Sequence, residues 1–338
     1  MERQVNVGII GVGRIGYLRA RLLVQHVPEA CVVAVADIRR EAAEACAAQF
    51  GIPQVFGNYE DLLLNKKIEA VFICTNTANH LPIIRDAAEA GKHIFCEKPI
   101  APSLKATDQA LTAVRSAGVL FQVGFNRRFD PSFCQIRELL AAGRLGKPYI
   151  LRITSRDPDL PPLKYIPTSG GLFLDMTIHD FDMARYLIGD EIEEVFATGS
   201  VLVDPRIREL GDIDTAAIVL RFQRGTLGLI DNSRRAVYGY DQRVEVLGSK
   251  GMAIALNRKT DTVKISTVEG VRSSRPLFFF TERYIESFIT EMKTFIHCVR
   301  ENRSPPVTGE DGRVAAALAC AAMRSLKEHR PIRLNEII

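Results

Sequence analysis

The chain has 338 residues, of which 44 are Lys or Arg and 40 are Asp or Glu, so its net charge is only +4. This length fits two domains with ample cores, and basic residues scattered among acidic ones argue against a nucleic-acid partner. There is no apolar run near the roughly 18 residues of a membrane span, no signal peptide, and no metal-site spacing among the seven cysteines. We therefore expect a cytoplasmic protein with reduced thiols, no metal and no membrane association.

The first predicted elements are a strand, a glycine-rich turn and a helix. Residues 5–10 are mostly apolar and lead into Gly11-Val12-Gly13-Arg14-Ile15-Gly16. The first glycine permits the tight bend, the second lets the backbone approach a pyrophosphate, and the third lets helix and strand pack closely. A second strand at 31–37 ends on Asp37, 21 positions after Gly16, close to the roughly 20 expected for a carboxylate that binds an adenosine ribose. The pattern predicts a dinucleotide-binding βαβ unit, with S-adenosylmethionine as the alternative ligand.

The chain continues with alternating strands and helices, which predicts a parallel sheet. Further strands are expected at residues 70–74, 93–96 and 120–123, with helices at 41–50 and 80–90. Ligands of such sheets bind at the carboxyl ends of the strands. The polar residues that directly follow these strands should therefore line one cleft.

After about Asn126 the pattern changes. A helix is predicted at 131–142 and a long strand at 148–156, and later strands are predicted at 195–203, 215–222, 227–232, 243–247 and 263–267, with closing helices at 287–300 and 313–327. Successive strands with few helical signals favour an antiparallel sheet. We predict an α/β chain with a doubly wound Rossmann domain over residues 1–125. Residues 126–338 should form an α+β domain with a large, open, mainly antiparallel sheet, and the last helices are expected to pack back on the first domain.

A first candidate catalytic motif lies at the end of the fourth predicted strand and has the sequence Cys96-Glu97-Lys98-Pro99. Pro99 restricts the preceding residue to extended geometry, so Lys98 should leave the strand in a fixed direction. An ammonium group there would polarise a carbonyl or stabilise an alkoxide. The alternative is a lysine paired with a surface acid.

A second motif lies on a predicted helix that follows Gly170 and Gly171. Asp175 and His179 are four residues apart and Asp182 is three residues further, so an α-helix would place them on one face. An imidazole between carboxylates suits general base catalysis near neutral pH. The alternative is a helix surface with a capped histidine, and a metal site is disfavoured because no second histidine or cysteine is near.

Together these motifs resemble the Gfo/Idh/MocA oxidoreductase family over essentially the whole chain. The glycine-rich turn, Asp37, the Glu97-Lys98-Pro99 motif and the helix at 170–179 are similar to that family, and segments 124–130, 155–158 and 236–241 are most similar to its inositol 2-dehydrogenases. The resemblance implies a Rossmann domain, NAD as cofactor, and a homotetramer formed through the open sheet of the second domain.

The resemblance also implies roles for single residues. Lys98, Asp175 and His179 match a catalytic triad, and Arg127, Asp157 and Tyr238 would bind the polyol beside them. The residues expected to bind NAD are Gly11, Gly13, Arg14, Ile15, Gly16, Asp37, Ile38, Thr75, Asn76, Asn79, His80, Glu97, Lys98 and Asn126. Some relatives carry an apolar residue where this chain has Asn126.

The resulting hypothesis is NAD-dependent oxidation of a secondary alcohol of a cyclic polyol, from myo-inositol to 2-keto-myo-inositol (scyllo-inosose). One alternative is a dehydrogenase or reductase for another inositol isomer or an aldose, since a fold does not separate these substrates. Another is a non-catalytic, nicotinamide-dependent sensor, which would not need His179 as a proton acceptor. Asp37 favours NAD over NADP because it would repel a 2′-phosphate, whereas Arg39 and Arg40 would pair with one.

Overall fold

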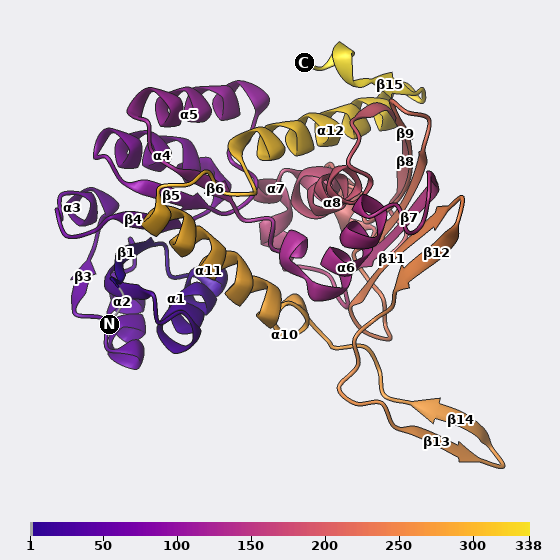
Figure 1. Ribbon diagram of the computed structural model, residues 1–338, viewed down its shortest axis with the longest axis horizontal. Coiled ribbons are helices and arrows are strands. Elements are labelled where there is room, and N and C mark those ends of the chain that lie inside the picture. Colours follow the sequence, from indigo (N-terminus) through magenta and orange to yellow (C-terminus); the bar gives the residue numbers. More distant parts are fainter. Residues whose placement is uncertain (1–2) are drawn as a thin grey trace. The chain divides into compact units, whose positions relative to one another are not determined.

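The computed structural model describes residues 3–338, which fall into two compact units (Figure 1). Unit 1 runs to Phe129 and also contains Glu286–Ala316, while unit 2 consists of Asp130–Ile285 and Ala317–Ile338. The chain therefore passes from the first unit to the second and returns to each once.

Unit 1 is built on a six-stranded parallel sheet in the order β3-β2-β1-β4-β5-β6, which confirms the predicted Rossmann architecture. Its strands are β1 (Val5–Ile10), β2 (Ala30–Ala36), β3 (Gln54–Phe56), β4 (Ala70–Ile73), β5 (His93–Cys96) and β6 (Phe121–Val123). Its helices are α1 (Arg14–His26), α2 (Arg40–Phe50), α3 (Tyr59–Leu63), α4 (His80–Glu89), α5 (Leu104–Ala117) and most of α11 (Ile285–Glu301), with short 3₁₀ turns η1 (Thr77–Asn79) and η2 (Asn126–Phe129). The sequence analysis did not predict β3, α3 or α5.

The core of unit 1 explains why its central strands lack an alternating pattern. All four residues of β4 are fully buried, as expected for a parallel strand covered on both faces. Phe72 on β4 stacks on Phe95 of β5 with ring centroids 4.9 Å apart, and Phe295 of α11 meets both rings edge-on at 5.5 and 5.7 Å. The late segment Glu286–Ala316 thus completes the core of the first unit.

Unit 2 is built on a seven-stranded sheet in the order β12-β11-β7-β10-β9-β8-β15. The strands β7 and β10 are parallel, and the other neighbouring pairs are antiparallel, which confirms the predicted sheet. The strands are β7 (Pro148–Arg156), β8 (Ile192–Ser200), β9 (Thr215–Phe222), β10 (Leu227–Ser233), β11 (Asp241–Gly248), β12 (Gly251–Ala255) and β15 (Ile332–Arg333). The remaining elements are α6 (Pro131–Ala141), η3 (Leu163–Tyr165), α7 (Ile166–Ser169), η4 (Phe173–Thr177), α8 (Ile178–Ile188), α9 (Arg206–Glu209), α10 (Phe280–Arg283), η5 (Leu334–Glu336) and the second half of α12 (Gly309–Glu328).

The strand predicted at 263–267 exists but does not join this sheet. It forms β13 (Lys264–Thr267), which pairs with β14 (Gly270–Ser273) in a separate, fully exposed hairpin. The hairpin projects from the rest of unit 2 in Figure 1. Its strand propensity was therefore read correctly, whereas its place in the large sheet was wrong.

One face of the seven-stranded sheet carries exposed apolar side chains. The helices α6 and α8 lie on the other side of the sheet (Figure 1), where Leu151 and Ile153 of β7 are buried. On the exposed face, Phe196, Val219 and Leu229 stand opposite one another on β8, β9 and β10 and form a row across three strands. We call these three residues the apolar row.

No helix in residues 3–338 is long and apolar enough to cross a membrane.

Candidate active site

The glycine-rich turn of unit 1 has the geometry that its sequence predicts. Gly11 has φ +87°, and a Cβ on it would lie 2.9 Å from the Thr75 side chain. A Cβ on Gly16 would collide with the carbonyl oxygen of Gly11, whereas a Cβ on Gly13 would meet nothing within 4 Å. Gly13 is also the N-cap of α1, where no side chain accepts a hydrogen bond from the first N–H groups. Open space before an uncapped helix N-terminus fits the pyrophosphate of a dinucleotide.

Asp37 lies beside this turn. Its Oδ2 accepts a hydrogen bond from the backbone N–H of Val12 at 2.9 Å, and its Oδ1 accepts one from the N–H of Arg39 at 2.9 Å. The guanidinium of Arg39 lies 3.6 Å from the same carboxylate. The acid at the end of β2 thus reaches the glycine-rich turn, and Arg39 is paired with it.

His80 links the segments that follow β4 and β5. Its imidazole is buried, with Nδ1 2.8 Å from the carbonyl oxygen of Pro99 and Nε2 3.1 Å from that of Thr75. Burial lowers the pKa of His80, which favours the neutral ring. Asn79, one residue earlier, donates to the side chain of Asn76 at 2.6 Å. These four residues, predicted to bind the cofactor, thus gather with Pro99 at the carboxyl ends of two neighbouring strands.

The Glu97-Lys98-Pro99 motif is held by a buried ion-pair network that sequence reasoning missed. Arg19 of α1 donates twice to Glu97 Oε1, at 2.9 and 2.7 Å, and once to Glu291 of α11 at 2.6 Å. Its guanidinium is fully buried and lies over the ring of Phe95 at 4.4 Å. Burial alone would lower the pKa of Arg19, but the carboxylates of Glu291 and Glu97 raise it above its usual value. The peptide bond between Lys98 and Pro99 is cis.

The remaining predicted residues of unit 1 have different exposures. Asn126 and Arg127, on η2, are both buried at 5% exposure. Ile38, predicted to contact the cofactor, is 91% exposed beside Asp37. Lys98, Asn126 and Arg127 belong to unit 1, whereas Asp157, Asp175, His179 and Tyr238 belong to unit 2.

The Asp/His helix of unit 2 begins differently from the prediction. Residues Phe173–Thr177 form a π-helical turn, and the α-helix α8 starts only at Ile178. Asp175 therefore lies on a π turn and His179 on an α turn, so ordinary α-helical spacing does not apply between them. Single π turns inside helices occur often at functional sites.

Asp175 is held by two side chains from outside the helix. The hydroxyl of Tyr165 donates to Oδ1 at 2.8 Å, and Nη1 of Arg234 donates to Oδ2 at 3.1 Å. Asp182, which the sequence analysis places on the same helix face as His179, is buried at 1% exposure. The neighbouring Asp180 accepts a hydrogen bond from Asn232 of β10 at 2.9 Å. The sequence motif gave no signal for Arg234 or Tyr165, because both lie outside it.

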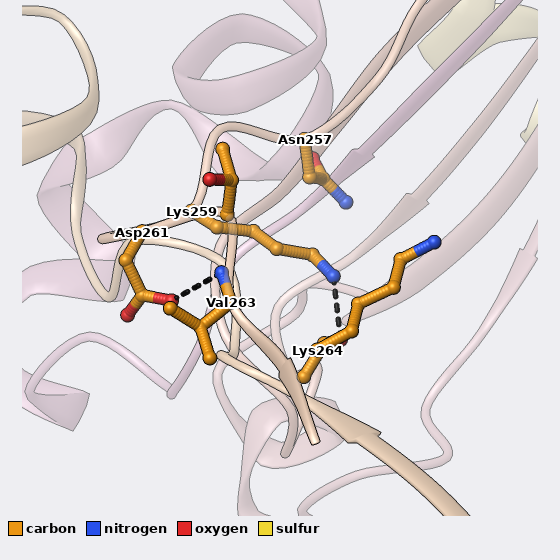
Figure 2. Close-up of a pocket in the computed structure, with 7 residues that line it drawn as sticks. Asn257, Lys259, Asp261, Val263 and Lys264 are labelled. Atoms are coloured by element: carbon orange, nitrogen blue, oxygen red, sulfur yellow. Dashed lines mark hydrogen bonds between the residues drawn. The ribbon is translucent and has the colours of Figure 1, made fainter. Parts of the chain in front are cut away.

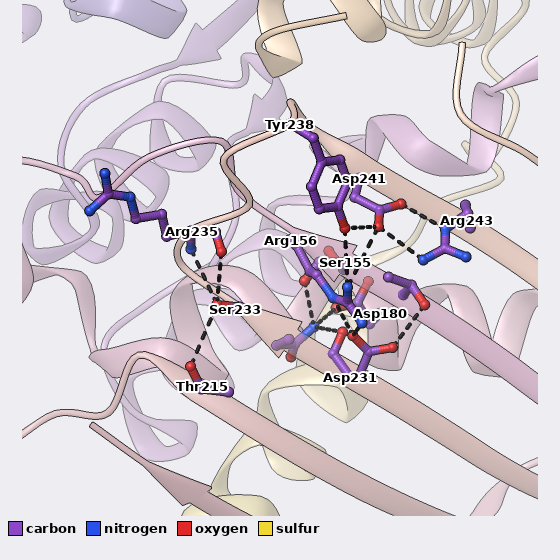
Figure 3. Close-up of polar contacts among 12 residues, drawn as sticks. Ser155, Arg156, Asp180, Thr215, Asp231, Ser233, Arg235, Tyr238, Asp241 and Arg243 are labelled. Carbon is purple, nitrogen blue, oxygen red and sulfur yellow. Dashed lines mark hydrogen bonds and ion pairs between the residues drawn. The ribbon is translucent and has the colours of Figure 1, made fainter. Parts of the chain in front are cut away.

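Asp157 and Tyr238 lie on segments that the backbone brings together. The N–H of Asp157 donates to Ser233 O at 2.9 Å, and the N–H of Ala236 donates to Asp157 O at 2.6 Å. The Tyr238 hydroxyl donates to Asp241 at 2.5 Å and accepts from Arg156 at 3.1 Å, within the polar cluster of Figure 3. Desolvation and the hydrogen bond to Asp241 raise the pKa of Tyr238.

A cavity of about 290 Å³ lies away from these groups, at the base of the β13–β14 hairpin (Figure 2). Two lysines and Asp261 line it, and Lys259 donates to Ser273 at 2.7 Å. None of the predicted site residues takes part. Among residues 3–338, no cluster of His, Cys, Asp and Glu has the arrangement of a metal site.

The parallel sheet, the glycine-rich turn and the acid after β2 define a dinucleotide-binding Rossmann protein. Comparison with protein families then gives the family. Residues 5–125 match the oxidoreductase family with an NAD-binding Rossmann fold, and residues 133–254 match the GFO/IDH/MocA C-terminal domain. The chain therefore belongs to the Gfo/Idh/MocA oxidoreductase family, and its first unit is an NAD-binding domain.

Individual relatives match over their full length. The chain is 48% identical to the myo-inositol 2-dehydrogenase of Thermotoga maritima over 99% of this chain and 100% of that protein. The structure of a myo-inositol dehydrogenase from Corynebacterium glutamicum superimposes with a TM-score of 0.94 at 36% identity, covering 98% and 99% of the two chains. A scyllo-inositol dehydrogenase from Lactobacillus casei, solved with NAD(H) and scyllo-inositol, gives a TM-score of 0.90 at 29% identity, covering 98% and 100%.

Proposed function

We propose that this protein oxidises a secondary alcohol of a cyclic polyol with NAD, converting myo-inositol to 2-keto-myo-inositol (scyllo-inosose). The observation that carries this proposal is the full-length similarity, at 48% identity, to a myo-inositol 2-dehydrogenase. The open space at Gly13 and the position of Asp37 beside the glycine-rich turn support NAD as the cofactor.

The proposed chemistry assigns one step to each residue of the triad. His179 takes the proton of the substrate hydroxyl, and Asp175 keeps the resulting imidazolium oriented and stabilised. Lys98 holds the oxygen while negative charge develops on it. Bound NAD⁺ supplies the hydride acceptor, and loss of hydride and proton together turns the alcohol into a ketone.

The polyol would be bound by groups that flank this triad. Arg127 and Asp157 offer donors and acceptors for the ring hydroxyls, which is the kind of pairing that discriminates strongly among polar substrates. Tyr238 is proposed to bind the polyol as well, and it lies on a segment that hydrogen-bonds to the backbone of Asp157 through Ala236. Glu97, also predicted to contact the cofactor, would hold the Lys98 segment in place through its pairing with Arg19.

The decisive experiment is a spectroscopic screen. The purified protein is mixed with NAD⁺ and a panel of inositol isomers and aldoses, and absorbance in the reduced-nicotinamide band is followed. We expect the highest kcat/KM with myo-inositol. A preference for scyllo-inositol, the ligand in the Lactobacillus casei structure, or for an aldose would replace the proposed substrate. Binding of NAD without turnover of any alcohol would favour the sensor alternative.

We also propose a homotetramer formed through the exposed sheet face of unit 2, and a cytoplasmic location. The apolar row supports the first proposal, because exposed apolar patches on sheets often mark interfaces. The cysteines support the second: all seven are free thiols, as is usual in a reducing compartment.

A further inference from the structure

Arg234 is a buried cation next to the proposed catalytic helix. The proposed triad assigns no role to this arginine. It follows β10 directly and is 1% exposed. Its Nη1 donates to Oδ2 of Asp175 at 3.1 Å, and its Nη2 donates to Oδ2 of Asp212 at 3.3 Å. One guanidinium thus bridges two carboxylates that are 37 residues apart in the sequence.

The second carboxylate leads back to the same helix. Oδ1 of Asp212 accepts a hydrogen bond from the backbone N–H of Leu172 at 3.0 Å, just before the π turn that carries Asp175. A Cβ on Gly171 would lie 3.1 Å from this Oδ1, so glycine leaves room for the carboxylate. Arg234 and Asp212 therefore close a ring that joins the backbone at Leu172 to the side chain of Asp175, within one helical turn.

The ring is itself anchored. The backbone N–H of Arg234 donates to the carbonyl oxygen of Asp214 at 2.8 Å. The carboxylate of Asp214 in turn accepts three backbone hydrogen bonds, at 2.8 to 3.2 Å, from residues 202–204. These bonds fix the backbone from which the Arg234 side chain extends.

The charges of Arg234 and its two carboxylate partners support the same arrangement. Burial alone would lower the pKa of Arg234, but the carboxylates of Asp175 and Asp212 raise it, and Asp157 adds to the effect. The guanidinium therefore stays charged where it faces the Asp175 carboxylate. With Tyr165 donating to its other oxygen, the Asp175 carboxylate has donors on both sides, which fixes its orientation.

We infer that Arg234 is a positioning residue of the reaction: it holds Asp175 in the orientation in which that carboxylate supports His179. This inference rests on the proposed function, because it assigns Asp175 to the oxidation. It also gives a reason for the unusual start of the helix, since the ring ties the residue before the π turn and the middle residue of that turn to one cation.

The test is a double-mutant cycle in kcat, made with Arg234→Met, Asp175→Asn and the combination of both. We expect Arg234→Met to lower kcat by about 10- to 100-fold, because misplacing a reacting group by about 1 Å has effects of that size. The dissociation constant of NAD, measured by titration, should change less than about twofold, because the cofactor binds unit 1. In the Asp175→Asn background, Arg234→Met should cost less than about threefold.

Two further variants separate positioning from folding. Arg234→Lys keeps the charge but cannot bridge both carboxylates, so it should recover part of the kcat lost in Arg234→Met. The matched control is Arg235→Met, which removes the adjacent arginine, whose side chain is about half exposed; its kcat should equal that of the wild type. If Arg234→Met does not fold, as judged by circular dichroism, the cycle is run with Arg234→Lys.

The outcomes are distinct. Wild-type kcat in Arg234→Met, or an equal loss in the presence and absence of the Asp175 carboxylate, would overturn the inference. Failure of the proposed function shows in the wild type instead, as absence of turnover with every cyclic polyol. If the wild type then oxidises another alcohol, the same cycle is measured on that alcohol and decides the role of Arg234.

Discussion

At the scale of single residues, we expect Asp37 to decide between the two nicotinamide cofactors. Its carboxylate lies beside the glycine-rich turn and also holds Arg39, whose guanidinium is 3.6 Å away. An arginine paired in this way is less available to a 2′-phosphate, and the carboxylate repels one. We expect kcat/KM with NAD to exceed that with NADP, and Asp37→Ala to narrow or reverse the ratio. Equal efficiency of the wild type with both cofactors would show that Arg39 and Arg40 outweigh Asp37.

Lys98 gives the sharpest test of the proposed chemistry. If its ammonium stabilises the developing oxyanion, Lys98→Ala should lower kcat by about two orders of magnitude or more, with little change in NAD affinity. Steady-state kinetics and a NAD titration measure the two effects separately. The surface control is Lys105→Ala, an exposed lysine in the first turn of α5, which should retain wild-type turnover. A Lys98→Ala enzyme that keeps most of its kcat would remove this lysine from the mechanism.

At the scale of elements, the start of α12 is tied to unit 1 by an ion pair. Arg128 donates to Asp311 at 2.8 Å, and the backbone N–H of Thr308 donates to the same carboxylate at 2.8 Å. Burial alone would raise the pKa of Asp311, but Arg128 and these hydrogen bonds lower it overall. A carboxyl group whose pKa is lower in the folded state stabilises the protein above its unfolded-state value, and this stabilisation is lost as the pH falls through the folded-state pKa.

We therefore expect Asp311→Asn to lower the melting temperature near pH 7, with a loss of about 1 to 3 kcal/mol for a hydrogen-bonded charge that is largely buried. The difference in melting temperature between Asp311→Asn and the wild type should stay constant down to about pH 5. It should shrink below about pH 4, near the usual pKa of aspartate. Calorimetric scans at a series of pH values measure it. A difference that does not change with pH would mean that the substitution disturbs packing at this position rather than removing a stabilising charge.

The elements also show which parts of the fold and the site could be predicted from the sequence. Local patterns sufficed for the parallel sheet, the glycine-rich turn and the acid at its side, because each depends on residues within one βαβ unit. They did not reveal the partners of these elements: Arg19 and Glu291 are 272 positions apart, and no periodicity connects them. The π turn was missed for a related reason. The bonds that hold Asp175 and Leu172 come from Arg234 and Asp212, which lie outside the motif.

At the scale of the whole molecule, the exposed face of the seven-stranded sheet predicts assembly. The apolar row places Phe196, Val219 and Leu229 side by side across three strands. A charged side chain in the middle of this row would be buried in the interface without a partner of opposite charge. The free-energy cost of removing that charge from water would weaken the association of the subunits.

We expect light scattering to give a tetramer for the wild type and a smaller species for Val219→Glu at micromolar concentration. The control is Leu64→Glu, which changes an equally apolar residue that is 77% exposed on unit 1 and should leave the mass unchanged. A wild-type monomer would contradict the proposed assembly, and a tetrameric Val219→Glu would place the contact elsewhere.

The return of the chain to its first unit has a consequence for its biosynthesis. The NAD-binding unit needs Phe295 against its central strands and Glu291 against the buried Arg19, and both residues are translated after nearly all of unit 2. While the ribosome is still making unit 2, Arg19 has only Glu97 as a carboxylate partner, and the strands lack part of their cover. An incompletely paired buried charge strongly destabilises a fold. The cofactor domain, although encoded first, should therefore be completed only when the nascent chain has grown past Ala316, after most of unit 2 has been made.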